Sequence, residues 1–290
     1  MLLALLKTMR PRQWPKNGFV FFALIFDRQL FHRDAFLRTL AGFVLFCLVS
    51  SVVYIINDIS DIEADRQHPK KKLRPLPSGK LSVKAAWVAA AAIVFICLPL
   101  SYWLSPAFAA VLTAYLLINL AYSRWLKHIP ILDVFIIAAG FVLRVEAGVT
   151  LIVVERFSPW LYVVTTLGSL YLGFGKRRAE LTLLSKGAGS HRKVLDGYSI
   201  PLIDQYITIV ATATIVFYSF YTFTAENMPK NHSMMLTIPF IIYIIFRYQY
   251  LVHMTDQTGA PEEVLLTDRP VQIALVLMGI TVLVVFYLLQ

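Results

Sequence analysis

The feature that most constrains the fold is a series of apolar runs that recurs from one end of the chain to the other. Each run is close to the ~20 residues that a helix needs to cross a hydrocarbon core about 30 Å thick. Backbone polar groups must be satisfied internally in lipid, so the runs predict helices rather than open sheets. We expect an all-α, polytopic membrane protein with a single transmembrane domain over residues 1–290. The nine expected spans are 18–33, 36–56, 85–103, 106–122, 131–152, 159–175, 204–224, 235–252 and 271–289.

Composition narrows the classes of partner. The chain is 58% hydrophobic and 15% charged, whereas a soluble domain carries about 25% charged residues. No polar domain remains that could hold a nucleic-acid duplex, so we expect no nucleic-acid partner. The net charge of +10 is explained by lysines that flank the membrane and by contact with anionic lipid, or in part by an anionic substrate. Cys47 and Cys97 both lie inside apolar runs, which indicates neither a disulfide framework nor a zinc site.

The distribution of basic residues predicts the orientation. If all nine segments cross, 20 of the 27 Lys and Arg residues fall on the side that holds the N-terminus and the long loops 57–84 and 176–203, and five fall on the other side. This asymmetry follows the positive-inside rule. The first span is the weakest, because Asp27 and Arg28 interrupt it. Without it the basic N-terminus would lie outside, so we retain it and expect a cell (inner) membrane protein with a cytoplasmic N-terminus.

An acidic segment follows directly from the second span. Asp58, Asp61 and Asp65 are spaced i, i+3, i+7, so they lie on one face if the helix continues past the membrane. Three carboxylates near a helix C-terminus repel one another and are disfavoured by the helix dipole, so a cation must offset them. Oxygen ligands with room for water fit Mg²⁺. The alternative is a solvated acidic helix end that pairs with the lysines at 70–72.

Cations follow the acidic segment within ten residues. In a complex of metal and diphosphate, the metal would face the aspartates and the phosphate oxygens would face Lys71 and Arg74. Lysines beside a membrane are common, so the cations alone do not indicate a diphosphate site. With the aspartates they predict a magnesium-bound diphosphate substrate at the cytoplasmic face.

The pattern Asn57-Asp58-x-x-Asp61-x-x-x-Asp65 resembles the first aspartate-rich motif of the UbiA superfamily of intramembrane prenyltransferases. The resemblance extends over essentially the whole chain and implies a helical bundle with a central cavity. Most members carry a second aspartate-rich motif after the sixth span. Here that segment reads Gly173-Phe174-Gly175-Lys176-Arg177-Arg178-Ala179-Glu180-Leu181, with cations in place of carboxylates.

Further motifs are similar to the branch of this superfamily that acts on decaprenyl phosphate. They are Arg10-Pro11-Arg12-Gln13-Trp14-Pro15-Lys16-Asn17, His68-Pro69-x-Lys71-x-x-Arg74-Pro75, Tyr122-Ser123-x-x-Leu126-Lys127 and Gly175-Lys176-Arg177-x-Ala179-Glu180. The resemblance implies a magnesium-dependent pentosyltransferase that moves 5-phosphoribose from phosphoribosyl pyrophosphate to a polyprenyl (decaprenyl) phosphate. It implies that Asp58, Asp61 and Asp65 are the catalytic metal ligands. The implied substrate-binding residues are Lys16, Asn17, Asn57, Lys71, Arg74, Tyr122, Lys127, Arg144, Lys176, Arg177 and Glu180.

The replacement of carboxylates by cations after the sixth span fits this chemistry, because a donor and an acceptor with several phosphates need more cations. On a helix the three cations at 176–178 point in different directions. We expect Lys176 and Arg177 to contact phosphate, with Glu180 orienting Lys176 or a metal-bound water. An arginine inside a span is a functional hypothesis, so Arg144 is either a donor contact or a support of the fold, the latter including a pair with Glu146.

Two other functions remain open at this point. A prenyltransferase that moves a prenyl group from an allylic diphosphate to an aromatic acceptor would share the acidic site, but the missing second acidic motif argues against it. A transporter or flippase is compatible with a basic cavity, but it does not require the spacing of metal ligands at 58–65. A homo-oligomer is compatible with the sequence.

Overall fold

The computed structural model describes residues 1–67, 71–154, 158–185, 193–254, 261, 264 and 267–288. Among them there are helices and turns but no strand, which confirms the prediction of an all-α protein. The chain divides into two compact units. The first comprises Met1–Ile25, Gln29–Leu126 and Leu143–Val154. The second comprises Phe26–Arg28, Lys127–Val142 and the described part of Glu155–Gln290.

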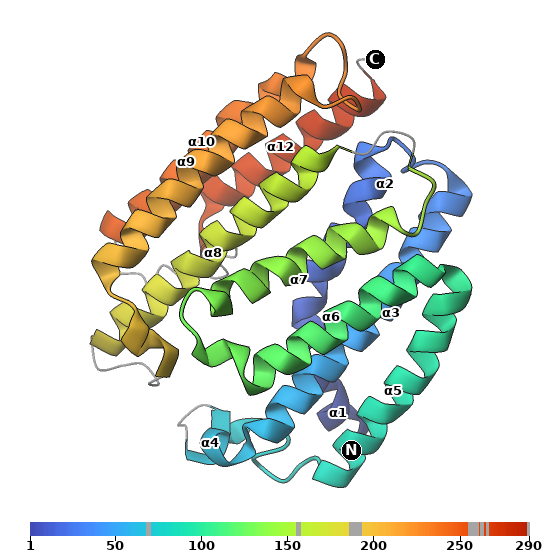
Figure 1. Cartoon of the computed structure of the whole chain (residues 1–290), viewed down its shortest axis with the longest axis vertical. Coiled ribbons are helices and arrows are strands. Elements are labelled where there is room, and N and C mark those ends of the chain that lie inside the picture. The colour runs from blue at the N-terminus through green and yellow to red at the C-terminus, as the bar shows by residue number, and fades with distance from the viewer. Residues whose placement is uncertain are drawn as a thin grey trace. The chain divides into compact units, whose positions relative to one another are not determined.

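The first unit is built around one long helix, α3 (Arg33–Ser60), which packs against α5 (Val83–Leu104) and α6 (Pro106–Arg124) (Figure 1). The two neighbours begin at serine N-caps. Ser82 Oγ accepts the backbone N–H of Ala85 at 3.2 Å, and Ser105 Oγ accepts that of Phe108 at 3.3 Å. The elements are α1 (Leu2–Met9), η1 (Pro11–Phe21), α2 (Phe22–Phe26), α3 (Arg33–Ser60), α4 (Ile62–Gln67), η2 (Lys71–Leu73), α5 (Val83–Leu104) and α6 (Pro106–Arg124).

The second unit pairs α8 with α9 and α10 with α12 (Figure 1). Helix α9 begins at a Ser199 cap, and α12 begins at an Asp268 cap whose carboxylate accepts the N–H of Val271 at 3.0 Å. Helix α7 starts in this unit and ends in the first. The elements are η3 (Leu126–His128), α7 (Leu132–Val149), α8 (Pro159–Ser185), η4 (Lys193–Gly197), α9 (Ile200–Thr224), η5 (Ser233–Thr237), α10 (Ile238–Met254) and α12 (Arg269–Tyr287).

Within the described residues, six helical segments are long and apolar enough to cross a membrane, which makes the chain an integral membrane protein. They are Arg33–Ser60, Val83–Leu104, Pro106–Arg124, Ile200–Thr224, Ser233–Met254 and Arg269–Tyr287. The expected count of nine is not confirmed. Helix α7 carries Asp133, Arg144 and Glu146, and α8 combines many polar and glycine residues with three cations at 176–178.

The expected span 18–33 is not one long helix. Its residues are divided between the end of η1, the five residues of α2 and a turn in which Arg28 has a φ of 60°. Pro15 lies inside η1 and has no N–H to donate, which disfavours a regular α-helix before this segment.

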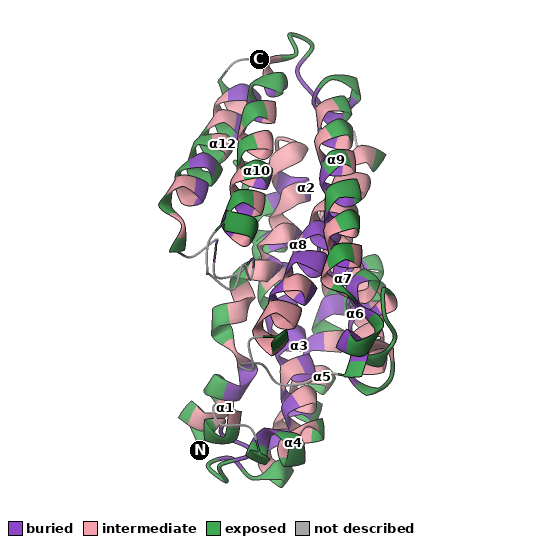
Figure 2. Cartoon of the chain, turned by 90° about the vertical axis from the view of Figure 1, so that its left-hand side faces the viewer, coloured by how far each residue is buried: buried purple, intermediate pink, exposed green. Residues whose placement is uncertain are grey.

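Each unit has a buried apolar core. In the first unit it includes Phe46, Val49 and Leu112, and in the second it includes Ile203 and Tyr248. Figure 2 shows exposed and buried residues alternating along α9 and α10, so each of these helices has a face turned away from the core. Large apolar side chains on such outer faces are what lipid contact requires.

Candidate functional site

The acidic segment lies where α3 gives way to α4. Helix α3 ends at Ser60, and Asp61 caps it. The backbone bonds nevertheless continue across the junction, because Asp61 N donates to Asn57 O at 3.0 Å and Asp65 N donates to Asp61 O at 2.8 Å. The nearly helical path places Asp58 and Asp65 two turns apart on one face, as their spacing predicts.

Asp58 and Asp65 converge on one cation. Each is 2% exposed. The Nη1 atom of Arg74 lies 2.6 Å from Asp65 Oδ2 and 3.3 Å from Asp58 Oδ1. Lys71 Nζ lies 3.9 Å from Asp65 Oδ1. The structure therefore assembles four of the predicted site residues at this junction.

Arg10 is a member of this cluster that sequence reasoning did not select. Its guanidinium forms an ion pair with Asp58 and lies over the Tyr54 ring, 5.0 Å from the ring centroid. Arg10 follows α1 in a left-handed conformation with a φ of 54°. The available signal was its place at the head of the basic motif that ends in Asn17, but nothing in that motif names its partner.

The fit to magnesium rests on Asp58 and Asp65. Among the residues that the structure describes, no group of three or more His, Cys, Asp or Glu side chains is arranged to hold a metal ion. A magnesium ion commonly uses only one or two carboxylates, with waters and substrate phosphates completing its ligands. Two buried carboxylates aimed at one cationic point meet that requirement. The participation of Asp61 remains a prediction.

A second buried cluster in the first unit joins Arg144 to Asn17. Arg144 donates from Nε to Asn17 Oδ1 at 2.8 Å and from Nη2 to the Tyr115 hydroxyl at 3.0 Å. Its guanidinium lies 5.0 Å from the Tyr115 ring centroid and 5.6 Å from that of Phe46. Asn17 in turn donates to Ser50 Oγ at 3.1 Å. These contacts support the fold, and contact with substrate by Asn17 or Arg144 remains a prediction.

The basic segment of α8 is held by carboxylates in the second unit. Arg177 is 1% exposed, its Nε lies 2.7 Å from Asp133 Oδ2, and its Nη1 contacts Glu180. Tyr198 also donates to Asp133, at 2.7 Å. Sequence reasoning paired Glu180 with Lys176 and did not foresee these partners of Arg177. Lys176 is half-buried on the same helix.

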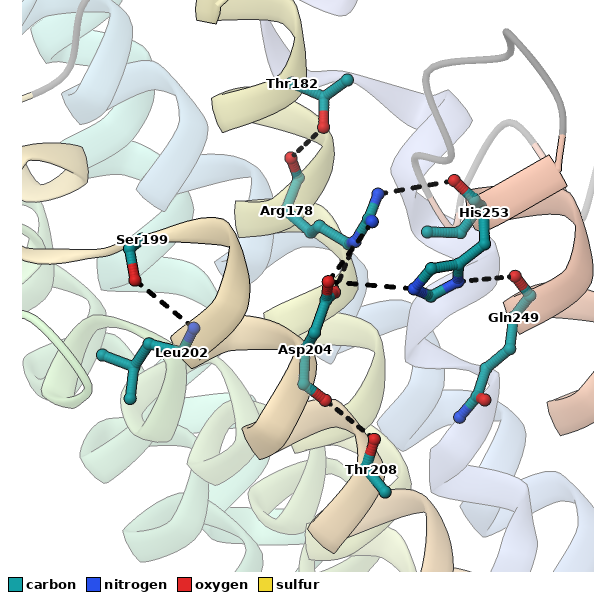
Figure 3. Close-up of polar contacts among 9 residues, drawn as sticks. Arg178, Thr182, Ser199, Leu202, Asp204, Thr208, Gln249 and His253 are labelled. Atoms are coloured by element: carbon teal, nitrogen blue, oxygen red, sulfur yellow. Dashed lines mark hydrogen bonds and ion pairs between the residues drawn. The ribbon is translucent and has the colours of Figure 1, made fainter.

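Arg178 has a structural role (Figure 3). Its Nε donates to Asp204 Oδ1 at 2.6 Å, and its Nη1 donates to the carbonyl of Val252 at 3.4 Å. His253 Nε2 lies 3.8 Å from Asp204 Oδ2. Arg178 thereby ties α8 to α9 and α10, in line with the expectation that the three cations cannot all face one way.

The other predicted contacts are half-buried. Lys16 lies on η1 and Tyr122 lies near the end of α6, both in the first unit, whereas Lys127 lies on η3 in the second. Their contact with substrate remains a prediction.

The helical fold and the acidic pair define a class of membrane protein. The model of the UbiA prenyltransferase family matches residues 18–175. The chain belongs to this family, which confirms the resemblance drawn from the motifs.

Two relatives that share one name are similar to the chain over most of its length. The chain is 34% identical over 283 residues to the decaprenyl-phosphate phosphoribosyltransferase of Mycolicibacterium smegmatis, covering 93% of this chain and 88% of that protein. It is 32% identical over 274 residues to the protein of the same name from Corynebacterium glutamicum, covering 93% and 82%. The UbiA homolog from Archaeoglobus fulgidus, solved with GPP and Mg²⁺, has the same fold, with a TM-score of 0.74, 18% identity, and coverage of 98% of this chain and 99% of that one.

Proposed function

We propose that the protein transfers 5-phosphoribose from phosphoribosyl pyrophosphate to a polyprenyl phosphate, with decaprenyl phosphate as the expected acceptor. The observation that carries the proposal is the similarity to two decaprenyl-phosphate phosphoribosyltransferases over 93% of this chain. The similarity covers most of each relative, so it concerns a whole enzyme and not a shared segment.

The acidic junction supplies the donor-binding chemistry in this proposal. Asp58 and Asp65 would hold a magnesium ion, with Asp61 as a further ligand. When bound, the ion provides positive charge that stabilises the departing pyrophosphate. Arg74 contacts both carboxylates and Lys71 contacts Asp65, and in this proposal the two cations bind oxygens of the donor diphosphate.

The reaction needs no strong general base. A phosphate oxygen of the acceptor attacks the anomeric carbon as the bond to pyrophosphate breaks, and that oxygen is already anionic at neutral pH. The protein must therefore bind and align several phosphates. Lys16, Lys127 and Lys176 are the half-buried cations that we assign to this task, and Asn17, Asn57, Tyr122, Arg144, Arg177 and Glu180 are assigned as supporting contacts.

We further propose that the donor is bound at the cytoplasmic face of the cell membrane. The 20-to-5 distribution of Lys and Arg supports this orientation.

The deciding experiment incubates purified protein with magnesium, labelled phosphoribosyl pyrophosphate and polyprenyl phosphate. Label should enter the organic phase in the wild type and not in an Asp58→Asn variant. A parallel incubation contains geranyl diphosphate and an aromatic acceptor. Prenyl transfer in that arm without phosphoribosyl transfer in the first would assign the chain to the prenyltransferases. Lipid movement across vesicles without either transfer would assign it to the transporters.

A further inference from the structure

The turn before α7 contains a strained residue. Ile131 has a φ of 70°, a conformation that glycine adopts readily and that a β-branched residue rarely adopts. Ile131 is 42% exposed, so burial of this residue does not account for the strain. Such backbone persists only where the surrounding structure fixes it.

The Tyr198 hydroxyl fixes this turn. It accepts the backbone N–H of Ile131, 67 residues away in the sequence, and donates to Asp133 Oδ1 at 2.7 Å. The adjacent Gly197 packs directly on the turn, because a Cβ at that position would lie 2.3 Å from Cγ of Pro130. One hydroxyl therefore binds the turn and the first residues of α7 together.

The same network continues into the basic segment of α8. Asp133 is fully buried and forms the ion pair with Arg177, which contacts Glu180. Burial, together with the hydrogen bond to Asp133, raises the pKa of Tyr198 above its ordinary value. The hydroxyl therefore stays neutral at physiological pH and keeps its proton for Asp133.

Two predicted phosphate contacts are close in the sequence to members of this network. Lys127 is in η3, four residues before Ile131, and Lys176 directly precedes Arg177. We propose that Tyr198 is a positioning residue for phosphate binding: its hydroxyl holds the strained turn, and with it Lys127, on the buried network that also anchors the Lys176 segment. This inference rests on the proposed function, and the phosphate concerned belongs to the donor or to the acceptor.

The first test is Tyr198→Phe, which removes the hydroxyl and almost no volume. Amides of residues 126–133 should exchange with deuterium about tenfold faster, as expected when one hydrogen bond is lost. KM for one of the two phosphate substrates should rise about tenfold, with a smaller change in kcat. Separate titrations of phosphoribosyl pyrophosphate and polyprenyl phosphate identify which substrate it is.

A matched control is Tyr171→Phe. Tyr171 is buried in the same unit and donates to the carbonyl of Ile245 at 3.0 Å, away from the turn. The control should lower thermal stability to a comparable extent but leave exchange at 126–133 and both KM values unchanged. Adding Ile131→Gly to Tyr198→Phe should lower the raised KM most of the way back to the wild-type value, because glycine holds a positive φ without the hydroxyl.

The outcomes separate this proposal from the proposed function. Unchanged exchange at 126–133 in Tyr198→Phe, or two unchanged KM values in an active enzyme, would overturn the positioning role. If the wild type transfers no phosphoribose, the proposed function has failed, and binding of inorganic pyrophosphate decides instead. Binding that is about tenfold weaker in Tyr198→Phe than in Tyr171→Phe then supports the positioning role, and equal binding overturns it.

Discussion

At the scale of single residues, the acidic junction is governed by the pairing of buried charges. Arg74 contacts both Asp58 and Asp65, and Arg10 contacts Asp58. A buried charge that loses its partner is strongly unfavourable. The two arginines therefore allow two carboxylates to lie close together in a site with little exposure to water. The same arginines are donors of the kind that bind phosphate oxygens.

Loss of either carboxylate should abolish most turnover. We expect Asp58→Asn and Asp65→Asn to lower kcat by about 100-fold or more, since a charged oxygen ligand becomes a neutral amide. The measurement is the transfer rate as a function of magnesium concentration. Full activity of either variant, or of the wild type in excess chelator, would contradict the assignment. An Asp61→Asn variant with normal turnover would remove Asp61 alone from the ligand set.

Part of this site could be predicted from the sequence. The convergence of Asp58 and Asp65 follows from a local property, the spacing of residues along one helix. The contact of Arg10 with Asp58 and that of Tyr198 with Ile131 join residues 48 and 67 positions apart. Such contacts depend on how helices pack. The burial of Arg177 between carboxylates was missed because a Lys-Arg-Arg run has no periodicity that tells which cation faces the core.

At the scale of elements, Asp268 joins two helices of the second unit. It caps α12 and accepts hydrogen bonds from Nε and Nη2 of Arg247 on α10, the shortest at 2.9 Å. The bond from Arg247 lowers the pKa of Asp268, and the cap bond from Val271 acts in the same direction. Folding therefore stabilises the ionised form of Asp268.

The stability contributed by Asp268 should be lost in acid. A carboxyl whose pKa is lowered on folding stabilises the protein at pH values above its ordinary pKa of about 4. This contribution to stability disappears as the pH falls through the folded-state pKa. Asp268→Asn keeps an oxygen acceptor for the cap but removes the charge. Thermal unfolding in detergent should show a gap of about 1 kcal/mol or less between wild type and variant at pH 6. The gap should close by pH 3, and a constant gap would contradict the ion pair.

The approach of α7 to the N-terminal segment requires a glycine. A Cβ at Gly148 would lie 2.1 Å from the carbonyl oxygen of Val20, and backbone atoms cannot move aside as a flexible side chain can. Gly148→Ala should destabilise the first unit by about 1–3 kcal/mol. Gly168→Ala in α8, where the added methyl meets no atom within 4 Å, should be neutral or stabilising by up to about 1 kcal/mol. Thermal unfolding of the two variants checks the contrast, and equal effects would refute it.

The helices themselves were predicted to different degrees. The six segments with the strongest apolar windows appear as long helical segments, because length and hydropathy are properties of the segment alone. The segment 18–33 is not a single helix, and Pro15, Asp27 and Arg28 mark the reason in the sequence. Helix α4 could be expected only as a continuation of α3, since most of its own residues are polar and give no apolar periodicity.

At the scale of the whole molecule, the basic residues and the helices together predict a topology that can be tested. Lys80 precedes α5 and Lys230 follows α9, and both are exposed. Three of the segments that qualify as spans separate them, and five helices do so if α7 and α8 also cross. Either number is odd, so the two positions lie on opposite sides of the membrane if α7 and α8 both cross or if neither crosses.

The first span can be decided separately from the rest. Lys7 is exposed on α1, and only the η1–α2 segment and α3 lie between it and the acidic junction. If the η1–α2 segment crosses the membrane, Lys7 and Lys80 share a side. If it does not cross, they lie on opposite sides. The expected cytoplasmic N-terminus therefore depends on a segment that the structure does not form as one long helix.

Labelling single cysteines in intact cells should therefore resolve the topology. Native Cys47 and Cys97 are buried, so they contribute little background. An impermeant maleimide added outside should label Lys230→Cys and not Lys80→Cys, because the side with 20 of the 27 basic residues is expected to face the cytoplasm. Lys7→Cys should be protected as Lys80→Cys is, and both should react once the cells are permeabilised. Labelling of both Lys7→Cys and Lys230→Cys, with Lys80→Cys protected, would show that the first segment does not cross. Labelling of Lys80→Cys would place the acidic junction outside and separate it from a cytosolic donor.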